Sequence, residues 1–431
     1  MMLAKDSTSD SISIPAVLIA ATALIFPFVN IIYIIYPITF LGKNVWLVAP
    51  VLVIMALYLS TLFDVRKGFT VKKTDIIFLA IVIAGGLIFY LRELVYVERR
   101  SFLDYRYILA PTIFLLVSKR FVNGDKNINF LSSALVLTCF IQAILGILHA
   151  SFFPELNISF DPDNVKNVEF VFDAERTREG GTLGASIYAN VIVCGMFLLA
   201  TKRPTPTSLR SSILLTISIM VMLYAVTLSG SRYPIVIAGL LTLTFFINSL
   251  SNWRQWVAIG MLAIFSIIWF TNMENVEFYS IFRFSEDSGG RIDKLILPFE
   301  LLIADMFHLL VGASNELTAN TYSSSGVGIS DNSYWLLSLQ FGPIFALFWF
   351  GFVVNLLMRD IVNNASFFFL VYFLIGLGIT NCILWEPWVF LAIFTGTILH
   401  RRDQIGGEIY DKYYPHSELR WRLENSTEPI N

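Results

Sequence analysis

The sequence predicts an all-α polytopic membrane protein with about twelve transmembrane helices. Hydrophobic residues make up 56% of the 431 residues and aromatic residues 15%. Charged residues make up only 14%, whereas soluble proteins average about 25%. The mean hydropathy is +0.69. Charge-free runs recur along the chain, and a run of roughly 20 apolar residues is long enough to cross a bilayer core as a helix.

These runs define the expected spans. They lie near 13–36, 46–63, 75–91, 103–118, 130–150, 184–201, 211–228, 233–250, 255–271, 333–357, 364–381 and 386–400. The fourth is the weakest, because only the stretch between Arg106 and Lys119 is free of charge. A re-entrant segment there would invert the side assignment of every later loop. The predicted organisation is one transmembrane domain over 1–400 and a cytoplasmic tail over 401–431.

The distribution of basic residues sets the expected orientation. With both termini cytoplasmic, 18 of the 30 basic residues fall in inside segments, in agreement with the positive-inside rule. The first apolar run lacks a cleavage site and is expected to be retained. Cys139, Cys194 and Cys382 are too scattered for a disulfide framework, and neither cysteines nor histidines show metal-ligand spacing. We therefore expect no metal and no cofactor, and nothing indicates a nucleic-acid partner.

The outer basic residues are mostly arginines. Nine of these 12 residues are arginine, against ten of the 18 inside. Topology needs only positive charge, but an arginine fork can grip a phosphate or carboxylate at two points. The bias suggests a site for a phosphorylated ligand. The alternative is that these arginines pair with outer acidic residues or lipid headgroups.

Two outer segments, 151–183 and 272–332, are long enough to contribute a site, because loops of this length are usually functional or disordered. The first ends in Glu175-Arg176-Thr177-Arg178-Glu179-Gly180-Gly181-Thr182. The second, between spans nine and ten, contains an amphipathic run from Ile292 to Leu310, typical of a helix along the membrane surface. It ends at Asp331-Asn332-Ser333, where Asp331 is either a helix N-cap or a catalytic group.

Arg232 lies between two apolar runs in Ser229-Gly230-Ser231-Arg232-Tyr233-Pro234. An arginine at a helix end near the bilayer is costly, which makes it a candidate for binding an anion. The alternatives are a snorkelling anchor and a tight turn between helices.

These stretches, taken in order, resemble the bacterial O-antigen ligase and polymerase superfamily of membrane glycosyltransferases. The similarity covers roughly 170–360. It comprises an Arg-rich outer segment ending in Gly-Gly-Thr-Leu, then Ser-Gly-Ser-Arg, an outer loop with Leu-Leu-Val-Gly-Ala, and Asp-Asn-Ser-Tyr followed by Phe-Gly-Pro. The resemblance implies a GT-C-like membrane fold and an active site on the periplasmic face of the inner membrane.

The resemblance assigns individual residues of this chain to positions in the family's motifs. Arg176 or Arg178 precedes a helix that contains Asn190, and Arg291 falls on the arginine that opens the helix of the long loop. Arg232 falls on the arginine of a Ser-Arg-Gly motif, but Tyr233 replaces its glycine. Asp331 stands where the ligase branch has a histidine, and His308 is a poor substitute for it. This departure favours a repeat-unit polymerase over a lipid A ligase.

The resemblance implies transfer of a glycan from an undecaprenyl pyrophosphate carrier to a second lipid-linked repeat, without a metal. Preorganised arginines would stabilise the departing pyrophosphate, and a carboxylate would accept the hydroxyl proton. The expected catalytic residues are Asp331, Arg232, Arg291 and, in reserve, Glu175. The expected pyrophosphate ligands are Arg176, Arg178, Arg232, Arg283 and Arg291, and the expected glycan contacts are Asn190, Asn332 and Tyr334. A chain-length regulator is a further possible partner.

Three alternatives remain open. A ligase would transfer finished glycan to a lipid A core. A lipid-linked oligosaccharide flippase would place polar groups at a midplane cavity, whereas the span interiors here are nearly free of charge. A scaffold without catalysis has no feature in its favour.

Overall fold

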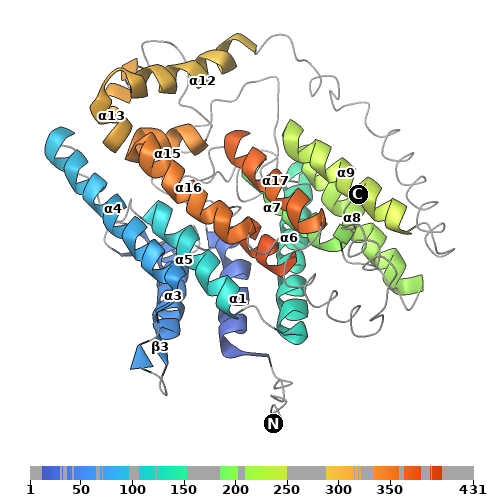
Figure 1. Cartoon of the computed structure of the whole chain (residues 1–431). Coiled ribbons are helices and arrows are strands. Elements are labelled where there is room, and N and C mark those ends of the chain that lie inside the picture. The colour runs from blue at the N-terminus through green and yellow to red at the C-terminus, as the bar shows by residue number, and fades with distance from the viewer. Residues whose placement is uncertain are drawn as a thin grey trace, which may run out of the picture.

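The structure is a computed structural model that describes most of the helical regions of the chain (Figure 1). The described residues are 12–29, 32, 36–40, 43–64, 68–69, 71–96, 106–121, 124–152, 185–201, 209–249, 288–314, 316–318, 320–321, 333–358, 364–379, 389 and 391–399.

The described chain is helical apart from two short antiparallel strand pairs. The first half contains α1 (Ile14–Ile25), the 3-10 turn η1 (Phe26–Phe28), α3 (Val45–Leu62), α4 (Lys73–Tyr96), α5 (Arg106–Phe121), α6 (Asp125–Phe152) and α7 (Ala185–Thr201). The second half contains α8 (Leu209–Leu228), α9 (Arg232–Ser249), α12 (Ser288–Ile303), α13 (Met306–Val311), α15 (Ser333–Phe341), α16 (Pro343–Met358), α17 (Asn364–Ile379) and helical residues 391–399. Strand β1 (Thr39–Phe40) pairs with β2 (Lys43–Asn44), and β3 (Phe63–Asp64) with β4 (Gly68–Phe69).

The predicted all-helical character is confirmed for most of the described residues. Every expected range except 255–271, which lies outside the described residues, contains helix. Among the described residues, two helices, Lys73–Tyr96 and Lys126–Ser151, are long and apolar enough to cross a membrane, and seven shorter apolar helices accompany them. The number of spans and their orientation stay predictions.

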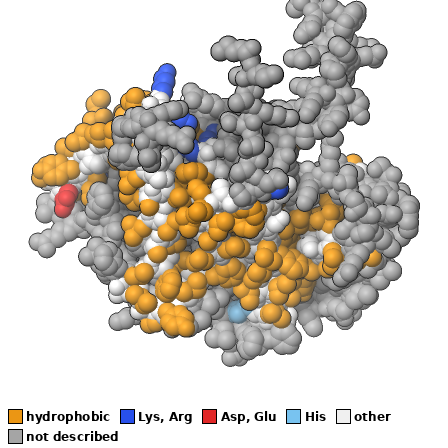
Figure 2. Space-filling model, turned by 90° about the horizontal axis from the view of Figure 1, so that it is seen from below, with side chains coloured by type: hydrophobic (Ala, Val, Ile, Leu, Met, Phe, Trp, Pro, Cys, Tyr) orange, Lys and Arg blue, Asp and Glu red, His pale blue; other side chains and the backbone are white. Residues whose placement is uncertain are grey.

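Helix α4 presents apolar side chains on its exposed surface. Only 17% of its most apolar 18-residue window is buried, whereas the central helix of a soluble domain would be mostly buried. Its exposed residues include Leu79, Ile83, Leu87 and Leu94, each more than half exposed. Figure 2 shows that hydrophobic side chains also dominate the described surface on the face seen from below. These features favour a membrane protein.

The predicted tenth span, 333–357, is wrong as a single helix. It consists of α15 and α16, separated by Gly342 with φ +83°. A left-handed residue ends a helix, and proline at the next position starts a new one readily because it has no N–H to leave unpaired. Nine residues give α15 a length of about 14 Å, too short to cross a bilayer core.

The weakest predicted span, 103–118, is a central helix. All nine residues 110–118 of α5 are buried. Two polar groups lower the hydropathy of this run, yet one of them, Thr112, accepts a hydrogen bond from Trp349 Nε1 of α16 at 3.0 Å. A helix enclosed by other helices can carry such polar groups because neighbouring side chains satisfy them.

The core of the other half of the bundle is formed by α6, α7, α8 and α9, which pack closely on one another. Gly195 of α7 faces Cys139 of α6 so closely that a Cβ at Gly195 would lie 2.6 Å from the Cys139 Cβ. Close approach at small residues is the usual way in which membrane helices gain packing energy. Asn190 and Tyr188 lie on the same buried helix α7.

Candidate functional site

The Ser-Gly-Ser stretch forms the tight turn between α8 and α9. Ser229 is fully buried, and its Oγ donates to Val226 O at 2.6 Å and accepts from Ser231 N at 3.1 Å. Gly230 has φ +62°, a conformation that glycine adopts without strain. Arg232 is then the first residue of α9. The turn therefore fixes the place of the arginine at a helix N-terminus.

Four residues that we call the tyrosine cluster, Asn190, Tyr233, Tyr334 and Tyr372, join α7, α9, α15 and α17. Tyr233 stacks on Tyr372 with ring centroids 5.5 Å apart and an interplanar angle of 14°, and its hydroxyl donates to Tyr372 O at 2.7 Å. Tyr334 donates to Leu374 O at 2.7 Å. The tyrosine that replaces the expected glycine at position 233 thus anchors α9 to α17.

The two hydroxyls bind the carbonyls of residues 372 and 374 of α17. Helices α9 and α15 are therefore both hydrogen-bonded to α17. We call this pair of contacts the clamp on α17. This clamp brings together the Ser-Gly-Ser-Arg and Asp-Asn-Ser-Tyr stretches, which are about 100 positions apart in the sequence.

Asn190, an expected glycan contact, is fully buried in α7. Its Oδ1 accepts from Tyr372 Oη at 2.6 Å, and its Nδ2 has no hydrogen-bond partner among the described residues. In this arrangement Asn190 orients Tyr372 and has no exposed surface to offer a sugar. Tyr334 is only partly buried and also packs against Phe350, at 4.7 Å between centroids.

A second site forms around Arg92, one of the nine outer arginines. Arg92 is 1% exposed and lies near the end of α4. Its Nη1 donates to Val311 O at 2.9 Å, Leu339 O at 2.8 Å and Gln340 O at 2.6 Å, and its Nη2 donates to Ala313 O at 2.6 Å. The guanidinium thus caps the C-terminal ends of α13 and α15 together, where carbonyls lack partners within the helix.

Glycines make the Arg92 site possible. Gly312 has φ +81°, and a Cβ there would lie 2.2 Å from Leu339 O and 2.6 Å from Arg92 Nη1. A Cβ at Gly342 would lie 2.5 Å from Leu310 O. Tyr96, one turn after Arg92, donates to Gly312 O at 2.9 Å. The Leu-Leu-Val-Gly-Ala and Phe-Gly-Pro stretches therefore meet at Arg92.

The expectation that the outer arginines face a ligand is incorrect for Arg92. Its partners are backbone carbonyls, and neither an acidic side chain nor a lipid headgroup is needed to explain its burial. The sequence offered little sign of this role. The pattern that could have indicated it is the glycine in Leu-Leu-Val-Gly-Ala, which marks a close approach of backbone to another group.

Arg232 and Arg291 both lie in the first turn of a helix. Arg232 begins α9, and Arg291 is the fourth residue of α12, after Ser288-Gly289-Gly290. Neither helix has an acidic residue in its first turn. A cation at this end opposes the helix dipole, so arginine there is unfavourable for the helix alone. The same N–H groups and positive charge together attract an anion.

Several predicted site residues lie outside the described residues, namely Glu175, Arg176, Arg178, Arg283, Asp331 and Asn332. The helix that Asp331 was expected to cap does begin at Ser333. Among the residues that the structure describes, no group of three or more His, Cys, Asp or Glu side chains could hold a metal ion.

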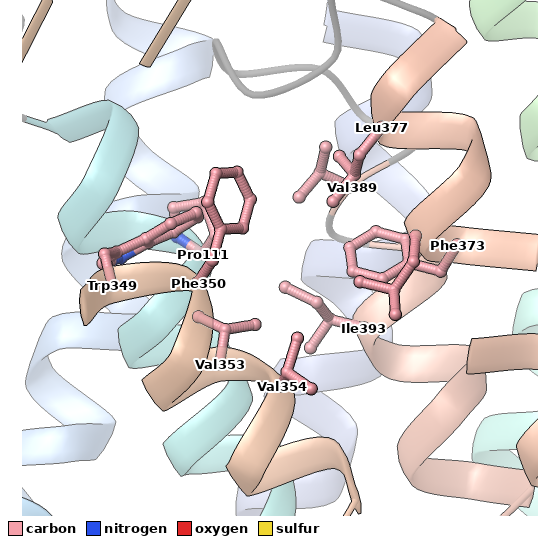
Figure 3. A pocket seen from close by; sticks show the side chains of 10 residues that line it. Pro111, Trp349, Phe350, Val353, Val354, Phe373, Leu377, Val389 and Ile393 are labelled. Carbon is pink, nitrogen blue, oxygen red and sulfur yellow. The ribbon is translucent and has the colours of Figure 1, made fainter. Parts of the chain in front are cut away.

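An apolar pocket lies between α5, α16, α17 and the helical residues near the C-terminal end of the described chain (Figure 3). Every side chain that lines it is apolar apart from the indole N–H of Trp349, which donates to Thr112. Its lining has no group to bind a phosphate or a sugar hydroxyl. It is therefore separate in chemistry from the tyrosine cluster.

Comparison of the chain with models of known protein families gives no match, and comparison with curated proteins gives none either.

Proposed function

We propose that the chain is a membrane glycosyltransferase that polymerises oligosaccharide repeat units carried on undecaprenyl pyrophosphate. In this proposal twelve spans place both termini in the cytoplasm and the active site on the outer face of the inner membrane. The observation that carries the proposal is the convergence of the stretches that resemble the O-antigen polymerase superfamily. Tyr334 lies in one of these stretches, Tyr233 directly follows another, and Asn190 lies on the helix after a third; all three bind residues 372 or 374 of α17.

The position of α15 adds support. Tyr334 at its start belongs to the tyrosine cluster, while Leu339 and Gln340 near its end bind Arg92. The seven residues from Tyr334 to Gln340 span about 9 Å. A short helix anchored at both ends is a rigid element, and catalytic groups are positioned most precisely by rigid elements.

The proposed chemistry uses arginines for the leaving group. The anomeric carbon of the donor sugar is attacked by an acceptor hydroxyl, whose proton passes to the Asp331 carboxylate. The bond to the pyrophosphate oxygen breaks, and Arg232 and Arg291 stabilise the charge that develops there, with Arg176, Arg178 and Arg283 as further ligands. Both central arginines stand at helix N-termini, where backbone N–H groups add to the attraction for an anion.

The experiment is deletion of the gene followed by gel analysis of surface glycans. Loss of the ladder with single repeats retained is the result expected for a polymerase. Loss of all surface glycan with accumulation of lipid-linked polymer would instead identify a ligase. Unchanged glycan would remove the proposal altogether.

Two substitutions test the residue roles in the complemented deletion strain. Arg232→Lys keeps the charge but removes the fork, so we expect a loss of polymer of about tenfold or more at normal protein level. Asp331→Asn keeps the capping ability and removes the base, and we expect a loss of similar size. Full activity of either variant would contradict the role assigned to that residue.

A further inference from the structure

The second half of α12 is apolar on two opposite faces. Leu297, Pro298, Leu301 and Leu302 face the protein, where they pack near Leu339 and Trp335. At 100° per residue, the opposite face carries Ile296, Phe299 and Ile303. These three side chains are 46%, 52% and 55% exposed, and the only polar residue beside them is Glu300.

A helix whose outer face touches water normally carries polar side chains there. Residues 296–303 instead have the composition of a helix that is covered on nearly all sides, with Glu300 as the exception. The first half of α12, from Ser288 to Lys294, contains the charged residues Arg291, Asp293 and Lys294. The helix is therefore polar at its start and, apart from Glu300, apolar toward its end.

The exposed apolar surface continues onto α13. Asp305 ends the turn between the two helices and caps α13 by accepting from Phe307 N at 2.9 Å. Beyond it, Met306 is 81% exposed and Leu310 is 52% exposed. The same surface meets α4, where Tyr90, Leu94 and Val95 are also half exposed or more. Helices α4 and α13 are in contact, and the Tyr96 and Phe307 rings pack edge to face at 6.2 Å.

The length of α4 fixes the depth of this surface. Its 24 residues span about 36 Å, and a hydrocarbon core is about 30 Å thick. With Lys73 at one boundary, residues 92–96 reach the other boundary. Since α13 packs on Arg92 and Tyr96, it lies at the level where acyl chains meet headgroups. Figure 1 shows α12 and α13 together at this end of the bundle.

We propose that α13 and the second half of α12 form a lipid-binding surface. Its exposed apolar side chains are inserted into the part of the acyl-chain region nearest the headgroups; they are Ile296, Phe299, Ile303, Met306 and Leu310. The occupant is bilayer phospholipid, because the surface is continuous with the lipid-facing side of α4 and lies at interfacial depth. Arg291 and Lys294 stand in the polar half, where phosphate headgroups are available. This inference is independent of the proposed function.

The test is depth-dependent fluorescence quenching of the full-length protein in phospholipid nanodiscs. A polarity-sensitive fluorophore is attached at Phe299→Cys or Ile303→Cys in a Cys382→Ser background, since Cys139 and Cys194 are buried. We expect a blue-shifted emission, strong quenching by lipids that carry a spin label near the headgroup, and weak quenching by aqueous iodide.

Matched control positions calibrate the depth. Ile83→Cys on α4, about 15 Å from the start of its helix, should be quenched best by lipids labelled deep in the acyl chain. Glu316→Cys, at an exposed position, should be quenched by iodide. Strong iodide quenching at 299 and 303 would overturn the proposal, and so would deep-label quenching equal to that at Ile83. Protection from both iodide and lipid labels would also overturn it, and would indicate a second copy or another protein on this surface.

Discussion

The two ends of α4 hold buried charge in different ways. At its start, Asp75 forms an ion pair with Arg120 of α5, and it also accepts from Tyr58 Oη at 3.0 Å and from Lys72 N at 2.9 Å. Near its end, Arg92 donates to four backbone carbonyls of α13 and α15. One arginine is neutralised by a carboxylate and the other by helix ends.

The difference lies in what each arrangement requires of the side chain. Each helix C-terminus carries roughly half a negative charge, so two of them together approximate one carboxylate. Those partial charges are spread over carbonyls from separate segments, and only a planar fork with several donors reaches them all. The carboxylate of Asp75 presents its charge in one place. The Arg92 site should therefore be less tolerant of substitution than the Asp75 site.

Arg92→Ala should have the largest effect. It removes the donors of four carbonyls at buried helix ends, and we expect a loss of about 3–5 kcal/mol in stability. Arg92→Lys should fare almost as badly, because one ammonium cannot reach carbonyls in both α13 and α15. Thermal unfolding of the detergent-purified protein, followed by size-exclusion chromatography, measures both. A lysine variant as stable as the parent would show that charge alone suffices.

Gly312→Ala tests the same site without changing any charge. The added Cβ would collide with Leu339 O, and its backbone φ of +81° is strained for alanine. We expect a loss of about 2–3 kcal/mol. Gly86→Ala is the matched control, because it lies on α4 with nothing within 4 Å of its added Cβ, and it should be neutral or slightly stabilising. Equal stability of the two variants would contradict the close packing at Gly312.

Asp75→Asn should cost less. Asparagine has one acceptor oxygen, so it keeps the bond from Tyr58 or the bond from Lys72 N but not both, and Arg120 loses its charged partner. Because the Arg120 side chain is 13% exposed, water compensates in part, and we expect a loss of about 1–2 kcal/mol. The double variant Asp75→Asn with Arg120→Gln should recover some of this loss in the same unfolding assay. A double variant that is worse than both single variants would show that Arg120 has a further role.

Hydropathy predicted the helices well because a membrane helix must satisfy its backbone within one apolar run. It failed at 333–357, where Gly342-Pro343 interrupts a run that stays apolar throughout. It also undervalued α5, because Arg106 and Lys119 leave only a short charge-free run, although residues 110–118 are all buried and Thr112 accepts from Trp349 of α16. Local composition does not report such partners from distant helices.

The candidate site was predicted in part. The order of the motif stretches indicated that they act together, and Tyr233 and Tyr334 do meet at α17. The role of Tyr372 was missed, because nothing in its apolar run distinguishes it from a lipid-facing tyrosine. Arg92 was counted among the outer arginines but given no role of its own, because the carbonyls that bind it belong to the backbone. Because every residue has a backbone carbonyl, no residue type in the sequence marks these partners.

Tyr233→Phe and Tyr334→Phe should have the smallest effects on stability. Each removes one hydroxyl that donates to α17, at a cost of about 1 kcal/mol, while the Tyr233 stack on Tyr372 and the Tyr334 contact with Phe350 remain. Helix α17 is held by both, so the loss in the double variant should differ from the sum of the two single losses. Unfolding of the single and double variants measures this.

The same two variants distinguish a role in supporting α17 from a role in binding the glycan. If Tyr334 contacts the glycan, Tyr334→Phe should reduce polymer length or yield by more than Tyr233→Phe does, although the two variants lose equal stability. Tyr233 serves α17 alone, so polymer formation should survive its substitution at normal protein level. Equal loss of polymer in both variants would assign both tyrosines to the clamp on α17 and leave the glycan contact to residues that precede α15.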